Sequence, residues 1–292
     1  MSTGHDNGLP AERGAGRVPV TLRTLEQMAR DGEPFACLTA YDSTTARWLE
    51  RGGVHLLLVG DSAANVVLGF ERTVEMPLDL LIALTAAVKR GAPNTVVMAD
   101  MPFMSYHADD KEGVRNAGRF LAEGGADIVK VEADGSYTET VRRMVRAGIP
   151  VCAHIGTRPQ AAALTSGPKA SGRTKEEAAR VVEDAVRLEE AGASMLLIEA
   201  VPPEVTEAVM DQTSAPLIGI GAGTACHGQI LVVHDLLGLT DTPPRFAEPV
   251  ESLGPRVRSA AETWVRKVGE RSIGGRAYTM RGADSIAKGA GS

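Results

Sequence analysis

Short apolar runs recur along this chain, and their number restricts its fold more than any other feature. They occupy residues 35–42, 55–62, 95–102, 127–133, 150–156, 195–202, 216–223 and 230–235. Within a run, aliphatic residues follow one another rather than alternating with polar ones, which is typical of parallel strands buried on both faces. The runs therefore predict parallel strands, each of which needs covering structure on both sides.

Amphipathic segments separate most of these runs. Residues 77–92, 111–126 and 175–193 are rich in Ala, Glu, Arg and Leu, and the last of them has apolar residues at a helical period before Gly192. The spacing predicts helices over these ranges. Alternating strands and helices in this number favour a (β/α)8 barrel, with an open, doubly wound sheet as the alternative.

Composition and charge indicate one globular domain. The 292 residues are 43% hydrophobic, which suffices for a sizeable core, and the net charge of -6 comes without a basic cluster. That charge argues against nucleic acid and anionic membranes as partners. We expect a single barrel domain over residues 18–271, a disordered leader over 1–17, and a flexible Gly-rich tail over 272–292.

The same features predict a cytoplasmic location. No apolar segment approaches the roughly 18 residues of a membrane span, and the leader lacks the apolar core of a signal peptide. Cys37, Cys152 and Cys226 are widely spaced and match neither a disulfide framework nor a zinc site. Isolated thiols of this kind are at home in a reducing compartment.

Polar side chains appear where most of the apolar runs end. In a (β/α)8 barrel the carboxyl ends of the strands form the active-site face, so these side chains are predicted to converge. A lone buried aspartate is usually structural, but several buried carboxylates together are costly unless they hold a metal or pair with a cation. The residues at these positions are Asp42, Asp61, Ser62, Asp100, Lys130, Glu132, His154 and Glu199.

The spacing of Lys130 and Glu132 sharpens this prediction. They are two residues apart on one predicted strand, so both project to the same face, whereas Val129 and Val131 point to the helix-covered face. Lys130 then either forms an internal ion pair that lines the barrel or meets the carboxylate of a substrate.

The carboxylates at the run ends suit a hard cation. Asp61 and Asp100 supply oxygen ligands, with Glu132 beside them, and Mg²⁺ or Mn²⁺ takes one or two carboxylates together with waters and substrate oxygens. Glu199 ends an apolar run and is the candidate general base. His154 either polarises a substrate oxygen or hydrogen-bonds within the barrel.

The glycine-rich stretch GIGAGTACHGQ, residues 219–229, invites a nucleotide-binding interpretation that its spacing rejects. A dinucleotide fingerprint needs a third glycine where this chain has Thr224 or Cys226, and a P-loop needs Lys where it has Gln229. The stretch instead predicts a tight turn after a strand. The segment 156–173 is too long for an ordinary loop, and such segments are usually functional or disordered.

Several motifs in order resemble one enzyme family. LTAYD, LVGDS, VVMADMPFMSY, VKVE, PVCAHIG, LLIEAVP and IGIGAGTACHGQILVVHD are similar to the ketopantoate hydroxymethyltransferases over roughly residues 20–240. The resemblance implies a (β/α)8 barrel of the phosphoenolpyruvate mutase and isocitrate lyase type. It also implies Mg²⁺-dependent transfer of a hydroxymethyl unit from 5,10-methylenetetrahydrofolate to the 2-oxoacid 2-oxoisovalerate in pantothenate biosynthesis, by a homo-oligomer that is commonly a decamer.

The resemblance also implies roles for individual residues. It assigns Mg²⁺ ligation to Asp61, Asp100 and Glu132 and proton abstraction to Glu199. The residues it places around the substrate are Asp61, Ser62, Asp100, Lys130 and His154. In this interpretation the glycines of residues 219–223 keep the mouth of the barrel open.

The chain departs from the family pattern beside these positions. Ala63–Ala64 replace Leu-Gly, residues 83–85 read Ala-Leu-Thr where the family has Tyr-His-Thr, residues 169–173 read KASGR rather than KVQGR, and His227 replaces an acidic residue. Three alternatives therefore stay open. They are a hydroxymethyltransferase for a different 2-oxoacid, a C–C lyase or mutase of the related barrel group, and a non-catalytic scaffold.

Overall fold

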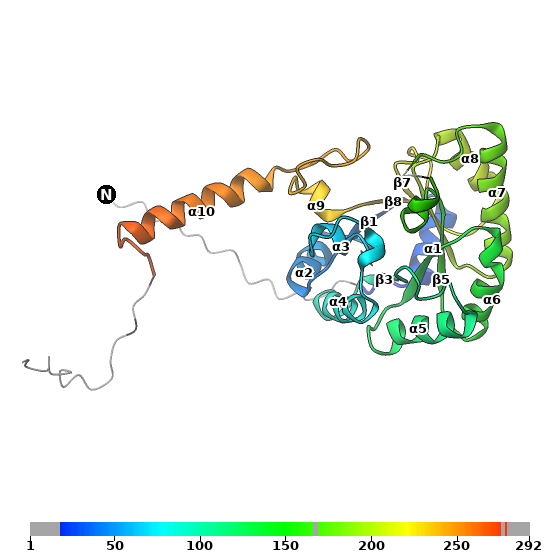
Figure 1. Ribbon diagram of the computed structural model, residues 1–292, viewed down its shortest axis with the longest axis horizontal. Coiled ribbons are helices and arrows are strands. Elements are labelled where there is room, and N and C mark those ends of the chain that lie inside the picture. The colour runs from blue at the N-terminus through cyan, green and yellow to red at the C-terminus, as the bar shows by residue number, and fades with distance from the viewer. Residues whose placement is uncertain (1–17, 166–168, 276–277, 279–292) are drawn as a thin grey trace, which may run out of the picture.

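The computed structural model describes residues 18–165, 169–275 and 278 (Figure 1). Within them, parallel strands close into a barrel in the order β1 to β8, which confirms the (β/α)8 barrel and excludes the open sheet. The strands are β1 (Phe35–Thr39), β2 (Leu56–Val59), β3 (Val96–Asp100), β4 (Ile128–Glu132), β5 (Val151–Gly156), β6 (Met195–Glu199), β7 (Leu217–Ile220) and β8 (Gly228–Leu231).

Helices alternate with the strands and confirm the three predicted helical segments. The α-helices are α1 (Leu22–Asp31), α2 (Ser43–Arg51), α3 (Ala63–Val66), α4 (Leu78–Gly91), α5 (Asp110–Ala122), α6 (Thr138–Arg146), α7 (Lys175–Glu190), α8 (Pro203–Gln212), α9 (Val233–Leu236) and α10 (Leu253–Gly269). Short 3-10 helices are η1 (Thr73–Glu75), η2 (Gly135–Tyr137) and η3 (Pro159–Thr165). In the described residues no helix is both long and apolar enough to span a membrane.

Side-chain alternation along the strands creates two cores. Val129 and Val131 of β4 pack in the layer between strands and helices, as predicted, while Ile128 belongs to the cluster inside the barrel. Leu25 of α1 is fully buried in that inner cluster. Because apolar side chains fill the lower barrel, polar groups gather only at the carboxyl ends of the strands.

Two expectations about strand ends were wrong. The predicted eighth strand, 230–235, is shifted, because β8 begins at Gly228 and ends at Leu231, and His234 and Asp235 lie in α9. Asp42 does not join the other polar side chains. It is exposed, and its carboxylate caps α2 by accepting hydrogen bonds from the backbone N–H groups of Thr44 and Thr45.

The outer face of β1 and β8 is less covered than that of the other strands. Ala36 and Gln229 are exposed and Leu38 is half-buried, whereas every residue of β2, β3 and β4 is buried. A cavity of about 710 Å³ runs along this face. The last helix, α10, does not cover it, since α10 extends away from the barrel in Figure 1 and none of its residues is buried.

The glycine-rich turn after β7 depends on missing side chains. Gly221 and Gly223 both adopt positive φ angles, 59° and 81°, which favour glycine. A Cβ atom on Gly221 would lie 2.6 Å from the ring of Phe246, so the turn and Phe246 pack in direct contact. The predicted tight turn is therefore confirmed. Of the predicted leader and tail, only residues 272–275 and 278 are described, so the domain boundaries stay a prediction.

Candidate active site

Three carboxylates are buried together at the mouth of the barrel. Asp61 follows β2, Asp100 ends β3 and Glu132 ends β4, and each is at most 7% exposed. Asp100 Oδ2 accepts a hydrogen bond from the backbone N–H of Asp61 at 2.9 Å. The ammonium of Lys130 lies 2.8 Å from Asp100 Oδ1. The predicted convergence of these strand-end groups is thus observed.

The negative charge of this cluster exceeds its positive charge. Lys130 is the one cation facing the three carboxylates among the residues that line the described cavity. Burial raises the pKa of Asp61 to about 7, with the charge of Asp100 adding to the effect. Burial also raises the pKa of Glu132 well above its usual range, and Asp61 contributes. Burial and the repulsion between neighbouring carboxylates therefore oppose ionisation of Asp61 and Glu132, and a bound cation would favour it.

His154 and Glu199 lie beside the carboxylates on the next two strands. His154 is 2% exposed, and its Nε2 lies 3.3 Å from Glu199 Oε2 without the alignment of a hydrogen bond. Its Nδ1 lies 3.2 Å from Lys130 Nζ. Burial and the nearby Lys130 charge lower the pKa of His154, so the ring is neutral at pH 7. The side chain of Glu199 remains 21% exposed and therefore reachable.

Gln160 is a member of the site that the sequence analysis did not identify. Its Nε2 donates to Asp61 Oδ2 at 2.8 Å and to the carbonyl of Met101 at 3.1 Å, and its backbone N–H donates to Glu132 Oε2 at 2.9 Å. Its Oε1 is buried and has no hydrogen-bond partner in the described part of the chain. The only earlier signal was the unusual length of segment 156–173.

These groups line a cavity of about 140 Å³ at the barrel mouth. Ser62 lies on its wall, with its hydroxyl 2.8 Å from that of Tyr41. Asp235 and Phe246 also line it, and neither was predicted to do so. A cavity of this size admits a small acid but not a drug-sized ligand, for which sites of roughly 300–1,000 Å³ are usual.

The donor set is compatible with a hard divalent cation, although no complete metal cage is formed. Among the described residues, no group of three or more His, Cys, Asp or Glu side chains is arranged to hold a metal ion. Mg²⁺, however, commonly uses only one or two carboxylates with waters and substrate oxygens. Asp61 and Asp100, with unbalanced negative charge and raised Asp61 pKa, fit such a site.

The positions that depart from the family pattern lie outside this cavity. Ala63 and Ala64 are fully buried in the layer outside the strands, and Leu84 packs against the same layer. His227 accepts a hydrogen bond from the backbone N–H of Leu217 through Nδ1 at 3.0 Å. Ala170, of the KASGR segment, lines a different cavity. None of them is among the residues that line the 140 Å³ cavity.

Solved structures of low sequence identity share the fold. A phosphonopyruvate hydrolase, described as a complex with oxalate and Mg++, matches with a TM-score of 0.60 at 13% identity, covering 86% of this chain and 87% of that one. A 2,3-dimethylmalate lyase, described as a member of the PEP mutase/isocitrate lyase superfamily, matches with a TM-score of 0.56 at 19% identity, covering 91% and 93%. These matches confirm the predicted barrel type.

Sequence relatives are closer. The protein from Shouchella clausii named 3-methyl-2-oxobutanoate hydroxymethyltransferase is 41% identical over 91% of this chain and 95% of its own length. The protein of the same name from Hyperthermus butylicus is 45% identical over 87% and 88%. The family model described as ketopantoate hydroxymethyltransferase matches residues 19–275. The chain is therefore an enzyme of the transferase class and belongs to the ketopantoate hydroxymethyltransferase family.

Proposed function

We propose that this enzyme transfers a hydroxymethyl unit from 5,10-methylenetetrahydrofolate to 2-oxoisovalerate, with Mg²⁺, and so makes ketopantoate. The observation that carries the proposal is one arrangement of groups in the 140 Å³ cavity. There, the reachable carboxylate of Glu199 faces a buried site formed by Lys130, Asp61 and Asp100. A base beside a cation-binding cluster suits removal of a proton next to a carbonyl group.

Lys130 and Ser62 hold the carboxylate of the 2-oxoacid in this proposal. Lys130 is a buried ammonium with three donors, and Asp100 and His154 take up only part of that capacity. The Ser62 hydroxyl also lies on the cavity wall, 2.8 Å from the hydroxyl of Tyr41. The acid would thus be fixed at one end, which leaves its C3 hydrogen for Glu199.

Asp61 and Asp100 would hold the Mg²⁺, with Glu132 close by. A bound divalent cation supplies positive charge that stabilises the negative oxygen as the neighbouring C–H loses its proton. Gln160 holds two of these carboxylates in place. Its side-chain N–H donates to Asp61, and its backbone N–H donates to Glu132.

The proposed reaction consists of proton removal from C3, release of the one-carbon unit and formation of a carbon–carbon bond. Glu199 takes the C3 proton, and the electron pair remains on the enolate. Water adds to the methylene carbon of the cosubstrate, both carbon–nitrogen bonds break, and the two nitrogens keep the protons of water. The released formaldehyde carbon accepts the electron pair from C3, and the new alkoxide takes up the proton that Glu199 had removed.

Two observations support 2-oxoisovalerate as the acceptor acid: the names of the sequence relatives, and the position of the residues that depart from the family pattern. The relatives at 41% and 45% identity are named for 3-methyl-2-oxobutanoate, which is 2-oxoisovalerate. The positions that depart from the family pattern, such as Ala63 and Leu84, pack away from the cavity. Pocket changes of one methylene alter selectivity by about 1–3 kcal/mol, and these positions offer no such change.

We also propose that the enzyme works as a homo-oligomer in the cytoplasm. The outer face of β1 and β8 lacks a covering helix in the described chain, and α10 has no buried residue. Val257 and Trp264 are 60% and 55% exposed on α10, and they lie seven residues apart on one helical face. Exchange of α10 with a second copy would bury both surfaces. The free thiols of Cys37, Cys152 and Cys226 support a reducing compartment.

The proposed reaction is tested by product analysis. The enzyme is incubated with 2-oxoisovalerate, 5,10-methylenetetrahydrofolate and Mg²⁺, and ketopantoate is followed by mass spectrometry. We expect product that depends on both the folate and the metal, with chelator abolishing it. Complete absence of ketopantoate with all components present would refute the proposed function.

A further inference from the structure

A buried carboxylate at the barrel mouth has no part in the chemistry described so far. Asp235 lies in α9, directly after β8, lines the 140 Å³ cavity and is only 6% exposed. Within the ranges that the structure describes, its carboxylate forms no hydrogen bond and no ion pair. Burying a carboxylate without partners is costly, and buried polar groups without partners are rare in folded proteins. A structural role therefore does not account for Asp235.

The other fully buried carboxylates of this cavity have polar partners. Asp100 lies 2.8 Å from the ammonium of Lys130, and Gln160 donates hydrogen bonds to Asp61 and Glu132. The wall around the carboxylate of α9 is different. Apart from that carboxylate, β7, β8 and the described segments after them contribute only apolar side chains to the cavity. They are Ile220, Ile230, Leu231, Val232, Pro244 and Phe246. The carboxylate of α9 is thus left free to act on a ligand.

Hydrogen bonds at both ends hold α9 in place. At its start, the backbone N–H of Val233 donates to Thr39 Oγ1, at the end of β1, over 2.9 Å. At its end, the carbonyl of Leu236 accepts a hydrogen bond from the backbone N–H of Val250, also over 2.9 Å. The backbone that carries Asp235 is therefore fixed relative to the strands of the barrel.

Asp235 faces the cavity from the side opposite Lys130. Lys130 lies on β4, and β8 is four strands away from β4 in either direction around the closed barrel. Glu199 ends β6, between these two positions. A 2-oxoacid whose carboxylate is held by Lys130 therefore presents its other end, with C3, towards the side of Glu199 and Asp235. The one-carbon unit has to reach C3 on this same side.

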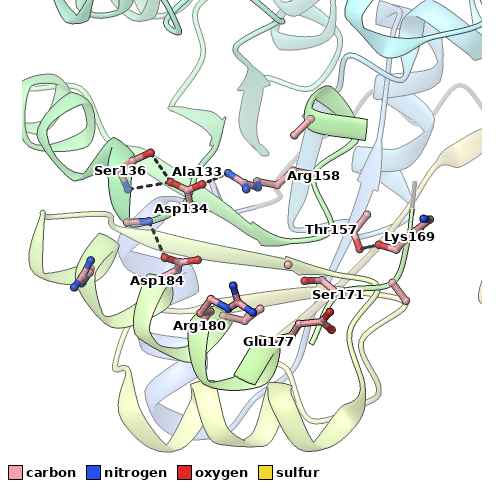
Figure 2. A pocket seen from close by; sticks show the side chains of 16 residues that line it. Ala133, Asp134, Ser136, Thr157, Arg158, Lys169, Ser171, Glu177, Arg180 and Asp184 are labelled. Carbon is pink, nitrogen blue, oxygen red and sulfur yellow. Dashed lines mark hydrogen bonds and ion pairs between the residues drawn. The ribbon is translucent and has the colours of Figure 1, made fainter. Parts of the chain in front are cut away.

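The larger cavity outside β4 and β5 does not extend this site. It measures about 650 Å³, and Figure 2 shows Asp134, Arg158 and Asp184 among the side chains that line it. None of its lining residues is among those that line the cavity at the barrel mouth. Asp134 pairs with Arg158 at 2.6 Å, and Asp184 accepts a hydrogen bond from the backbone N–H of Gly135 at 2.7 Å. These acidic groups are thus separate from the reacting atoms.

The proposed reaction moves protons on the one-carbon donor as well as on the 2-oxoacid. Each of the two nitrogens bonded to the methylene carbon gains a proton when its carbon–nitrogen bond breaks. Glu199 is already engaged with the proton from C3, and Asp61 and Asp100 with the metal. A further acid–base group is needed on the donor side, and general acid–base catalysis by a positioned carboxylate supplies such transfers.

We propose that Asp235 carries these protons while the one-carbon unit is released. The inference rests on the proposed function and adds a second acid–base group to it. As water attacks the methylene carbon, Asp235 takes one water proton and gives it to the first nitrogen, which leaves with the electron pair of its bond to carbon. Asp235 then takes the proton of the new hydroxyl and gives it to the second nitrogen. That bond breaks in the same way as the carbonyl of formaldehyde forms, and Asp235 is again ionised.

Two one-carbon donors separate this step from the rest of the reaction. 5,10-Methylenetetrahydrofolate requires the step, whereas free formaldehyde is already the released unit and does not. Formation of ketopantoate from each donor is measured with 2-oxoisovalerate and Mg²⁺, and exchange of the C3 proton is measured in D₂O without a donor. All three rates are compared between the unmodified enzyme, Asp235→Asn and the matched control Asp211→Asn, whose side chain is exposed on α8.

Asp235→Asn is expected to slow the reaction with the folate by about 10²–10⁴-fold, because the amide cannot carry a proton between water and nitrogen. The reaction with formaldehyde and the C3 exchange should stay close to those of the unmodified enzyme, and Asp211→Asn should leave all three rates unchanged. An undiminished folate reaction in Asp235→Asn, or an equal fall in all three rates, would overturn the assignment. Failure of the unmodified enzyme to make ketopantoate from either donor would instead refute the proposed function, and the assignment with it.

Discussion

The ammonium of Lys130 lies 3.2 Å from Nδ1 of His154. Lysine can only donate, so Nδ1 of the neutral ring must accept, and the ring proton is placed on Nε2. That nitrogen lies 3.3 Å from Glu199 Oε2. Lys130 thus sets the tautomer of His154, which leaves an Nε2–H beside the candidate base without the alignment of a hydrogen bond. Hydrogen bonds at catalytic sites are often long before substrate binds and tighten in the complex.

Glu199→Gln tests the candidate base. The change keeps the size of the side chain but removes its basic oxygen, so exchange of the C3 proton of 2-oxoisovalerate should slow by about 10²–10⁴-fold. The exchange is followed by NMR in D₂O. Glu204→Gln, on the exposed surface of α8, is the matched control and should behave like the unmodified enzyme. Undiminished exchange in Glu199→Gln would assign the base to another group.

The raised pKa of Asp61 predicts how pH affects the stability of the fold. Without metal, stability should fall as pH rises, whereas the stabilisation by Mg²⁺ should increase. The folded pKa of Asp61, about 7, exceeds its ordinary value of 3.8, so the folded state binds more protons between these values and metal-free stability falls as pH rises through this window. A bound Mg²⁺ favours the ionised form. Thermal unfolding at pH 5 and pH 8 should therefore show a larger stabilisation by Mg²⁺ at pH 8. Equal stabilisation at both pH values, or none, would contradict Asp61 as a ligand.

Lys130→Met should destabilise the fold as well as abolish activity. It leaves Asp100 buried without its cation, and breaking a buried ion pair in this way costs about 3–5 kcal/mol. Chemical denaturation measures the loss. The double variant Lys130→Met with Asp100→Asn should recover part of the stability while staying inactive. Lys89→Met, which breaks the more exposed pair with Asp127, should cost less. A stability loss no larger than that of Lys89→Met would argue against the large cost expected for leaving Asp100 buried without its cation.

Gln160→Ala is expected to weaken metal binding with little loss of stability. The side-chain amide orients Asp61, and outer partners of this kind typically alter metal affinity by about 10–100-fold. Mn²⁺ titration followed by electron paramagnetic resonance gives the affinity directly. Gln212→Ala, at the exposed end of α8, serves as the control. Unchanged Mn²⁺ affinity would show that Gln160 only packs over the site.

Trp264→Glu on α10 should reduce the size of the assembly. The indole is 55% exposed in the single chain, and burial of a large apolar side chain between copies would be lost. Light scattering during size-exclusion chromatography reports the mass. Arg266→Glu lies on the opposite side of the same helix and is expected to leave the mass unchanged. An unmodified enzyme that runs as a monomer would refute the homo-oligomer.

The barrel could be predicted because the pattern of apolar residues along the sequence reflects which residues are buried. Strands such as β3 and β4 are buried along their whole length, so their apolar runs were unbroken. β8 was misplaced because Gly228 and Gln229 are not apolar, and Gln229 lies on the uncovered outer face. The run therefore appeared to start late and to continue into α9.

Only those site residues that lie at the ends of strands could be predicted from the sequence. Polar residues at the ends of β3 and β4 converge because parallel strands end at one rim. Asp42 broke the pattern, although the following Ser-Thr-Thr could have indicated an N-cap. Gln160 comes from an irregular segment, and no periodic rule states where such a segment folds.

Proton exchange on a panel of 2-oxoacids is the sharpest test of the proposed enolate chemistry. The enzyme is incubated with Mg²⁺ in D₂O and each acid in turn, without folate, and loss of the C3 proton is followed by NMR. We expect metal-dependent exchange that is fastest on 2-oxoisovalerate. No exchange on any acid, with Mg²⁺ bound to the enzyme, would contradict the enolate chemistry itself.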